Sequence, residues 1–422
     1  NSDSLPYHML GCISTSSIRW SVTRRTVLEI STVVVMGTEN GLLVGGFYLL
    51  YGKNSFYVDL SPLFSKSKVR SYKSEGYELT TAYESVSIIK TKLDLMGMTM
   101  EYCRNSYGKC YPNSPVGFDL FLAILENIDL SKIKCGTSDR LEYDSDCFSF
   151  WDYVTRKFPN YFKHGEESIL DESTEKMNDL VLLRIFCEIS TFQQLTLDWN
   201  IFETINSGYY SEDEIFHPLK DVYKTVIVTE GSSDTSIIKR TIEAYFPQFV
   251  DFFIFIDMDK NYPFPGCGKM WSFFQGVVII NQTSRTLFVL DNDTEGNQTY
   301  DNMTSLKHQS NIGVCRLPHL PCMENVLIRY PLGDDYGDVN GRAVSIECFL
   351  DLTPIHNSPV FELDSFNRKM KEYQGRISQK TDLKKSISKI GKPNYDCHNL
   401  IILINHIFSE IIKLNNPLCD FY

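Results

Sequence analysis

The fold is decided by the stretch Val226-Ile-Val-Thr-Glu230-Gly231-Ser-Ser-Asp234-Thr-Ser-Ile-Ile238. A short run of β-branched apolar residues ends at Glu230, and an amphipathic pattern with near-helical spacing begins just after it. The pattern predicts a buried strand, a tight turn and a helix. We expect Gly231 to let the backbone bend where a Cβ atom would obstruct it. Because α/β sheets keep their ligands at the carboxyl ends of strands, Glu230 and Asp234 are expected to point into one crevice.

A second apolar run, about sixty residues on, ends in the same way: Arg285-Thr-Leu-Phe-Val-Leu290-Asp291-Asn-Asp293-Thr-Glu-Gly296. If both runs are strands of one parallel sheet, at least four carboxylates gather at one edge. Such a cluster repels itself unless divalent cations neutralise it, and its hard oxygen atoms suit Mg²⁺ or Mn²⁺.

These two motifs, in this order, resemble the Toprim domain of topoisomerases, primases and OLD-family nucleases. The resemblance covers roughly residues 222–352, and a later Ser345-Ile346-Glu347 favours the OLD-like nuclease branch. The segment that begins Met36-Gly-Thr, with a Gly-Phe strand and Val-Asp before Leu-Phe, resembles the HEPN/Toprim-associated N-terminal module. A HEPN ribonuclease needs Arg, four to six residues and then His, a pattern that this sequence does not contain.

The Toprim resemblance implies a site in which the same carboxylates are metal ligands and catalytic groups. Glu230, Asp291 and Asp293 are expected to hold one Mg²⁺ (or Mn²⁺) ion, and Asp234 and Glu347 to contribute to a second. We expect Ser345 to support Glu347 by a hydrogen bond. A further acidic pair, Asp257 and Asp259, follows the apolar run at 252–256 and competes with Asp291 and Asp293 for the metal role.

The function expected from this site is divalent-metal-dependent cleavage of phosphodiester bonds in DNA or RNA. The alternative is a non-catalytic Toprim-like sensor or regulatory module that binds nucleotide or nucleic acid. Related proteins often belong to prokaryotic anti-phage defence systems. The sequence contains no Walker GxxxxGK[ST] motif, so we expect any ATPase to be a separate partner. A homodimer is also compatible with the resemblance.

Composition limits where the protein works and what it binds. The chain has 422 residues, of which 43% are hydrophobic and 22% are charged, and its net charge is −12. This balance is typical of a globular protein and argues against a generally basic nucleic-acid coat. The twelve cysteines form no CxxC pair, and no run of 18 apolar residues predicts a spanning helix. We therefore expect a cytoplasmic protein with no membrane partner, in which the four Asn-x-Ser/Thr sequons occur by chance.

The predicted class is α/β (α+β overall), with a mainly parallel Toprim sheet flanked by helices. The expected parts are a non-native or disordered extension at 1–35, a β-rich module at 36–115, a helical segment at 116–220, the Toprim domain at 221–352 and a basic, helical region at 353–422. Strands are expected at Leu42–Val44, Gly46–Tyr51, Ser55–Val58 and within 77–92, and helices at Phe118–Leu125, Met177–Thr196 and Asn399–Leu414.

Three clusters have two interpretations each. The basic residues at 66–73 and the longer basic stretch at 368–392 either contact phosphates or form solvated surfaces. The aromatic run from Phe148 to Phe162 either stacks on bases or packs between helices.

Overall fold

The computed structural model describes residues 39–45, 47–53, 57–74, 77–112, 116–128, 177–206, 208, 210–256, 266–356 and 358–416. Several sequence-based expectations lie outside these residues. They are the extension at 1–35, the first part of the strand expected at Ser55–Val58, the aromatic run at 148–162, and the pair Asp257 and Asp259. The described end of that strand is wrong, because Tyr57 has a left-handed backbone and Val58 begins a 3-10 helix. In the described part of the chain, no helix is long and apolar enough to cross a membrane.

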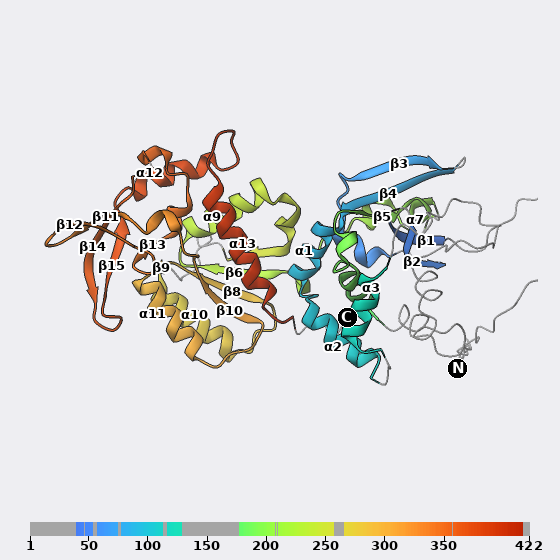
Figure 1. Ribbon diagram of the computed structural model, residues 1–422, viewed down its shortest axis with the longest axis horizontal. Helices are drawn as coiled ribbons and strands as arrows, with labels where there is room; N and C mark the ends of the chain where they lie inside the picture. The colour runs from blue at the N-terminus through green and yellow to red at the C-terminus, as the bar shows by residue number, and fades with distance from the viewer. Residues whose placement is uncertain are drawn as a thin grey trace, which may run out of the picture. The chain divides into compact units, whose positions relative to one another are not determined.

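The N-terminal module is built on a five-stranded antiparallel sheet with the order β2-β1-β5-β4-β3. Its strands are β1 (Glu39–Val44), β2 (Phe47–Lys53), β3 (Val69–Ser74), β4 (Tyr77–Ser85) and β5 (Thr196–Asn200). Its helices are α1 (Val86–Met96), α2 (Met100–Cys110), α3 (Phe118–Glu126), α6 (Asp179–Phe186), α7 (Phe202–Asn206) and α8 (Glu212–Ile215). Figure 1 shows the module in blue and green.

Two elements of this module differ from the sequence-based expectation. The apolar run at 77–92 is a strand only as far as Ser85, whose side chain accepts a hydrogen bond from the Ile88 amide and starts helix α1. The segment expected to be helical up to Thr196 ends earlier, and β5 then fills the middle of the sheet. Residues 197–200 alternate between apolar and polar side chains (Leu-Asp-Trp-Asn), and all four are buried in the sheet.

The basic cluster at 66–73 is largely paired with acids of the same module. Lys66 contacts Asp213 at 2.8 Å. The Nη2 atom of Arg70 donates to both carboxylate oxygens of Asp198, at 2.5 and 2.7 Å. These partners neutralise the cations, so the cluster is a structural feature of the module rather than a bare phosphate-binding surface.

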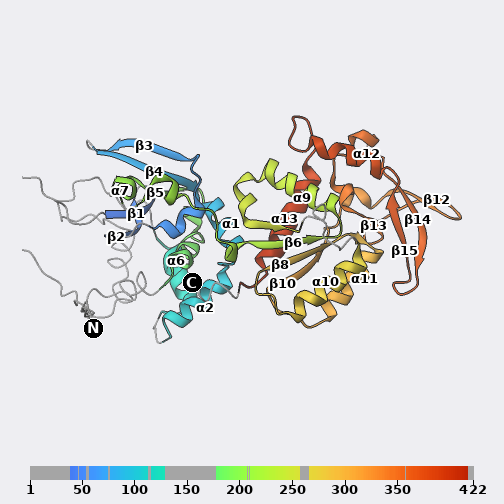
Figure 2. The ribbon, with the colours of Figure 1, turned by 180° about the vertical axis from the view of Figure 1, so that it is seen from behind.

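The second half of the chain is organised around a four-stranded parallel sheet with the order β10-β8-β6-β7. Its strands are β6 (Thr225–Thr229), β7 (Phe253–Phe255), β8 (Thr286–Leu290) and β10 (Ile312–Arg316). Helices α9 (Ser232–Tyr245) and α13 (His398–Ile412) cover one face, and α10 (Cys267–Ile279) and α11 (Thr294–Ser305) cover the other (Figures 1 and 2). The predicted α/β class, with helices on both faces of a parallel sheet, is confirmed.

The apolar side chains of the two central strands alternate between these faces. Ile227 and Leu287 belong to the core on the α9 and α13 side, whereas Val228 and Phe288 pack with Phe274 of α10. Burial on both faces explains the near-continuous apolar runs that made β6 and β8 recognisable in the sequence.

A second four-stranded sheet, with the order β12-β11-β14-β15, follows the parallel sheet in the chain. Its strands are β11 (Val326–Tyr330), β12 (Gly333–Gly337), β14 (Val360–Asn367) and β15 (Glu372–Ile377). The expectation that 353–422 is helical is therefore wrong for its first part, and holds for α12 (Lys380–Lys385) and α13. The polar hairpin and charged strands of this sheet lack the long apolar runs on which the sequence analysis relied.

A two-residue pairing connects the two sheets. Strand β9 (Asn292–Asp293) pairs antiparallel with β13 (Ala343–Val344), so that Asp293 lies opposite Ala343. This pairing brings the segment that follows β13 to the carboxyl end of β8.

The glycine that the turn geometry requires is Gly296 rather than Gly231. Gly231 has an extended backbone, and a Cβ atom there would meet nothing closer than 3.8 Å, so the expected steric role is not observed. A Cβ atom on Gly296 would lie 2.2 Å from the Asp291 carbonyl oxygen. The chain turns back from β8 into α11 so closely that only a hydrogen atom fits there.

We predict that Gly296→Ala lowers the free energy of unfolding by about 1–3 kcal/mol, because the new methyl group overlaps backbone. The matched control is Gly276→Ala in α10, where a Cβ atom meets nothing within 4 Å. It should raise stability by up to about 1 kcal/mol through helix propensity. Urea unfolding measures both, and equal stability of the two variants would contradict the steric argument.

Candidate functional site

The carboxyl ends of β6 and β8 form the centre of the site. The two strands are neighbours and parallel, with Thr229 opposite Val289, so Glu230 and Asp291 leave the sheet side by side. The Asp291 amide donates a hydrogen bond of 2.9 Å to Glu230 Oε1. The strand order places this point where the chain reverses direction across the sheet, from β7 back past β6 to β8. Open α/β sheets bind their ligands at such a switch point.

Asp293 is held by the start of α11 and by β15. Its Oδ1 atom accepts a 2.7 Å hydrogen bond from the Gly296 amide and so caps α11. Its Oδ2 atom accepts a 2.6 Å hydrogen bond from Gln374 Nε2. The Oε1 atom of the same Gln374 side chain accepts one of 2.8 Å from the Glu295 backbone amide. The role of Gln374 could not be predicted from the sequence, because a single glutamine belongs to no recognisable motif.

Asp234 lies in the first turn of α9. Its Oδ2 atom accepts a 3.0 Å hydrogen bond from the Gly231 amide, which closes the turn between β6 and the helix. A carboxylate at this position is also favoured by the positive end of the helix. The side chain is therefore fixed close to Glu230 by its own local structure.

Glu347 reaches the site through the β9–β13 pairing. The Ile346 amide donates a 3.2 Å hydrogen bond to Asp291 Oδ1, and the Ser345 hydroxyl donates one of 2.8 Å to Glu347 Oε2, as the sequence predicted. Glu347 has 0% of its surface exposed, so it is not an ordinary surface acid. All five carboxylates named from the sequence thus belong to one cluster.

Two lysines from α12 complete the cluster. Lys380 and Lys384 place their ammonium groups 3.1 and 3.4 Å from Glu347 Oε1. Both belong to the basic stretch that was noted in the sequence as a candidate phosphate contact. No feature of the sequence distinguished them from the other lysines there.

Burial and mutual repulsion make the carboxylates hard to ionise. Burial raises the pKa of Glu230 to about 7, against opposing hydrogen bonds from Asp291 and Cys267. Burial and the charge of Glu347 raise the pKa of Asp234 to about 6. For Asp291, burial and the other four acids hold the pKa well above its usual range.

In two further groups of the cluster, Asp293 and Lys380, burial is opposed by hydrogen bonds or by charge. Burial raises the pKa of Asp293, although the hydrogen bonds from Gly296 and Gln374 favour its charged form. Burial alone would lower the pKa of Lys380, but Glu347, Asp291 and Asp234 outweigh it, so the pKa rises and Lys380 stays a cation. The site as a whole therefore favours positive charge.

The donor set fits a hard divalent cation, because it consists of carboxylate oxygen atoms from several segments. The side-chain arrangement does not yet surround one. Among the residues that the structure describes, no three His, Cys, Asp or Glu side chains are placed to hold a single ion together. Glu347 is turned towards the two lysines, so binding calls for side chains to re-orient and for the lysines to release one oxygen atom.

Cys267 also contacts the cluster. Its Sγ atom lies 3.1 Å from Glu230 Oε2 and donates to it. Burial and the negative charge of Glu230 raise the pKa of this thiol far above its usual range, so it is a neutral donor and not a nucleophile.

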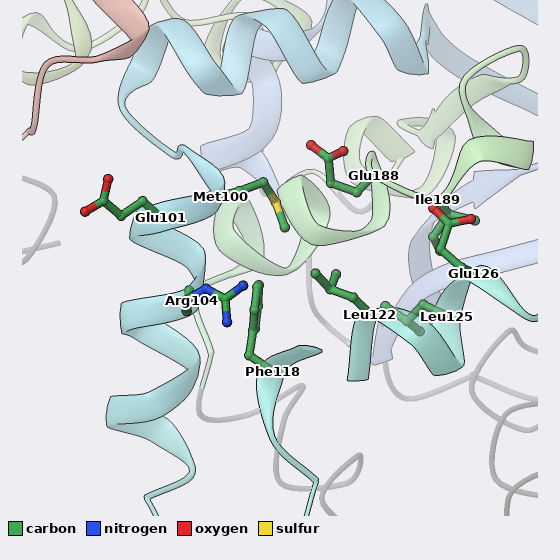
Figure 3. Close-up of a pocket in the computed structure, with 9 residues that line it drawn as sticks. All are labelled: Met100, Glu101, Arg104, Phe118, Leu122, Leu125, Glu126, Glu188 and Ile189. Carbon is green, nitrogen blue, oxygen red and sulfur yellow. The ribbon is translucent and has the colours of Figure 1, made fainter. Parts of the chain in front are cut away.

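A cavity of about 510 Å³ lies in the N-terminal module, away from these acids. Figure 3 shows it between α2, α3 and the end of α6, with Arg104 beside the ring of Phe118. Of its four charged lining residues, Arg104 pairs with Asp119 at 2.6 Å and Glu188 pairs with Arg184 at 2.5 Å. The other two are Glu101 and Glu126, and the rest of the lining is apolar.

Comparison with known proteins supports the N-terminal part of the sequence interpretation. Residues 36–222 match the family model HEPN/Toprim N-terminal domain 1. The chain therefore carries a HEPN/Toprim-associated module, and the match spans both the β-rich segment and the helical segment that were expected to be separate. No curated protein and no solved structure matches the chain.

The raised pKa of Glu230 predicts how the stability of the metal-free protein depends on pH. A carboxyl group whose pKa is higher in the folded state stabilises the fold at low pH, and that stability is lost as the pH rises through about 7. In EDTA, the free energy of unfolding of wild type should fall by on the order of 2 kcal/mol more than that of Glu230→Gln between about pH 5 and pH 8.5.

Urea unfolding at several pH values measures this difference. The control is Asp301→Asn, which removes an exposed acid from α11. Its pH dependence should equal that of wild type. If Glu230→Gln also follows wild type, the carboxyl group is not destabilised by its surroundings.

Proposed function

We propose that the protein is a divalent-metal-dependent nuclease that cleaves phosphodiester bonds at the acidic cluster. The observation that carries the proposal is the convergence of Glu230, Asp234, Asp291, Asp293 and Glu347 from three separate segments at the switch point of a parallel sheet. The sequence resemblance to Toprim nucleases supports it. So does the N-terminal match to a family whose description pairs HEPN with Toprim.

In this proposal Glu230, Asp291 and Asp293 hold one Mg²⁺ or Mn²⁺ ion, and Asp234 and Glu347 contribute to a second. Bound cations of this kind activate water and neutralise the charge of a scissile phosphate. The protein supplies the positions of the ligands, because the Asp291 amide fixes Glu230 and Gln374 fixes Asp293. Outer hydrogen bonds of this kind orient metal ligands and tune their affinity.

Lys380 has a separate role in the proposed reaction. It is a cation held among acids, 3.1 Å from Glu347, on a helix whose next turn carries Lys384. When a phosphate enters, its ammonium group is in position to stabilise the negative charge that develops on the phosphate oxygens.

The second candidate is a regulatory module that binds nucleotide or nucleic acid without cleaving it. The specific observation in its favour is that lysines already neutralise Glu347 and that the described acids do not surround a common ion position. This candidate predicts binding without turnover, so a cleavage assay separates the two.

We predict that purified wild-type protein cleaves plasmid DNA, single-stranded DNA or transfer RNA with Mg²⁺ or Mn²⁺ and not in EDTA. Glu230→Gln and Asp291→Asn should each reduce the rate by at least about a hundredfold, because each removes a charge from the ligand set. The matched control Asp301→Asn makes the same chemical change at an exposed position and should cleave like wild type.

Circular dichroism and thermal melting establish that the variants are folded. Equal cleavage by wild type and both site variants would show that a contaminant is responsible. Absence of cleavage by folded wild type on every substrate, with strand binding retained, would favour the regulatory module.

A further inference from the structure

A second cavity, of about 400 Å³, opens at the carboxyl end of β8 and β10 beside the acidic cluster. This volume lies within the range of small-molecule binding pockets. Asn292, which separates the two aspartates of the cluster, forms part of its wall, as do Asn297 and Tyr300 of α11. Arg316, the last residue of β10, lies opposite Leu290 in the sheet and so is one strand away from Asp291. Neighbouring strands lie only about 4.8 Å apart.

Arg316 brings a positive charge to this cavity that no neighbouring acid cancels. Within the described part of the chain, its guanidinium group forms no ion pair with a carboxylate. The guanidinium group donates instead to the side-chain Oδ1 atom of Asn297, and it lies 4.5 Å from the centre of the Tyr300 ring. Other arginines, such as Arg70 and Arg184, are paired with acids. The only acid in the lining, Glu410, is itself paired with Lys413 at 2.6 Å.

The cavity is physically connected to the acidic cluster through one loop. The Gly341 amide donates a 3.0 Å hydrogen bond to the Asn292 carbonyl, and Asn297 donates one of 2.8 Å to the Gly341 carbonyl. These bonds flank the β9–β13 pairing, which holds both Asp293 and the segment that leads to Glu347. A ligand in the cavity therefore contacts the loop that positions the carboxylates.

The chemistry of the lining suits a nucleotide. A guanidinium group that lacks an acidic partner binds phosphate through its planar fork of donors. Carboxamides such as Asn292 and Asn297 both donate and accept hydrogen bonds, as recognition of a base or sugar requires. The cavity thus offers an anion contact and neutral polar groups next to a site built from acids.

We propose that this cavity holds the nucleotide next to the scissile phosphate, with Arg316 binding the phosphate of that nucleotide. The inference rests on the proposed nuclease function, since it assigns a place to one part of its substrate. It also explains how an acidic protein keeps a polyanion at a cluster of carboxylates: the attraction comes from the adjacent strand end.

The test measures strand binding in EDTA, where the proposed cleavage does not occur. Fluorescence anisotropy with short labelled DNA and RNA single strands is recorded for wild type, Arg316→Gln and Arg316→Lys over a range of salt concentrations. The matched control is Arg329→Gln, which removes the same charge from an exposed position on β11. Thermal melting checks that each variant is folded, and metal-dependent cleavage is assayed in parallel.

Arg316→Gln should weaken binding about tenfold at low salt and lower the slope of log affinity against log salt by about 0.7, as expected for the loss of one phosphate contact with a single strand. The affinity of Arg316→Lys for the strands should lie between those of wild type and Arg316→Gln. The affinity of Arg329→Gln should equal that of wild type. If Arg316→Gln matches Arg329→Gln, the inference is overturned, and continued cleavage would leave the nuclease function standing.

Two other results would also overturn the inference. If wild type binds adenosine 5′-monophosphate through Arg316 but binds no strand, the cavity is a site for a free nucleotide. If wild type neither binds nor cleaves any strand, the nuclease function fails as well, and the subsite fails with it.

Discussion

The hydrogen bond from the Asp291 amide to Glu230 is the interaction on which the site depends. It joins the carboxyl ends of two neighbouring parallel strands. It forms because the register of β6 and β8 brings these two strand ends together at one edge of the sheet. The other acids are arranged around it: Asp234 by the first turn of α9, and Glu347 by the amide that bonds Asp291. The geometry is thus set mostly by backbone amides, whose positions a sheet fixes better than any side chain.

Negative charge is concentrated in this cluster. Several buried acids elsewhere in the described residues have a cationic partner, as Asp94 has in Arg184 and Glu84 has in Lys68. In the cluster, Glu347 is the acid with cationic partners. Burial and repulsion raise the pKa of Glu230, Asp234 and Asp291, and burial raises the pKa of Asp293. A protein keeps such a destabilising group of like charges when a ligand needs it. A bound cation would relieve the repulsion, and it would compete with Lys380 and Lys384 for the oxygen atoms of Glu347.

The parts of this arrangement that sequence could predict are those encoded locally. Glu230 and Asp291 each follow a short run of β-branched and apolar residues, and that pattern identified the strands, their parallel pairing and the shared edge. The placement of Lys380 could not be predicted, because its proximity to Glu347 depends on the packing of α12 against the segment 346–355, which no local pattern encodes. Strand β5 was missed because it has only five residues and directly follows the apolar pattern that predicted a helix up to Thr196. The close turn at Gly296 depends on an approach to the Asp291 carbonyl that only three dimensions reveal.

The central claim is that these carboxylates form a cation site, and direct ion binding tests it. Titration of the protein with Mn²⁺, followed by electron paramagnetic resonance of the free ion, counts the bound ions without any assumption about substrate. The account predicts that wild type binds at least one Mn²⁺ ion, that Mg²⁺ displaces it, and that Asp291→Asn loses it while remaining folded. Binding that is absent from wild type, or unchanged in Asp291→Asn, would contradict the account.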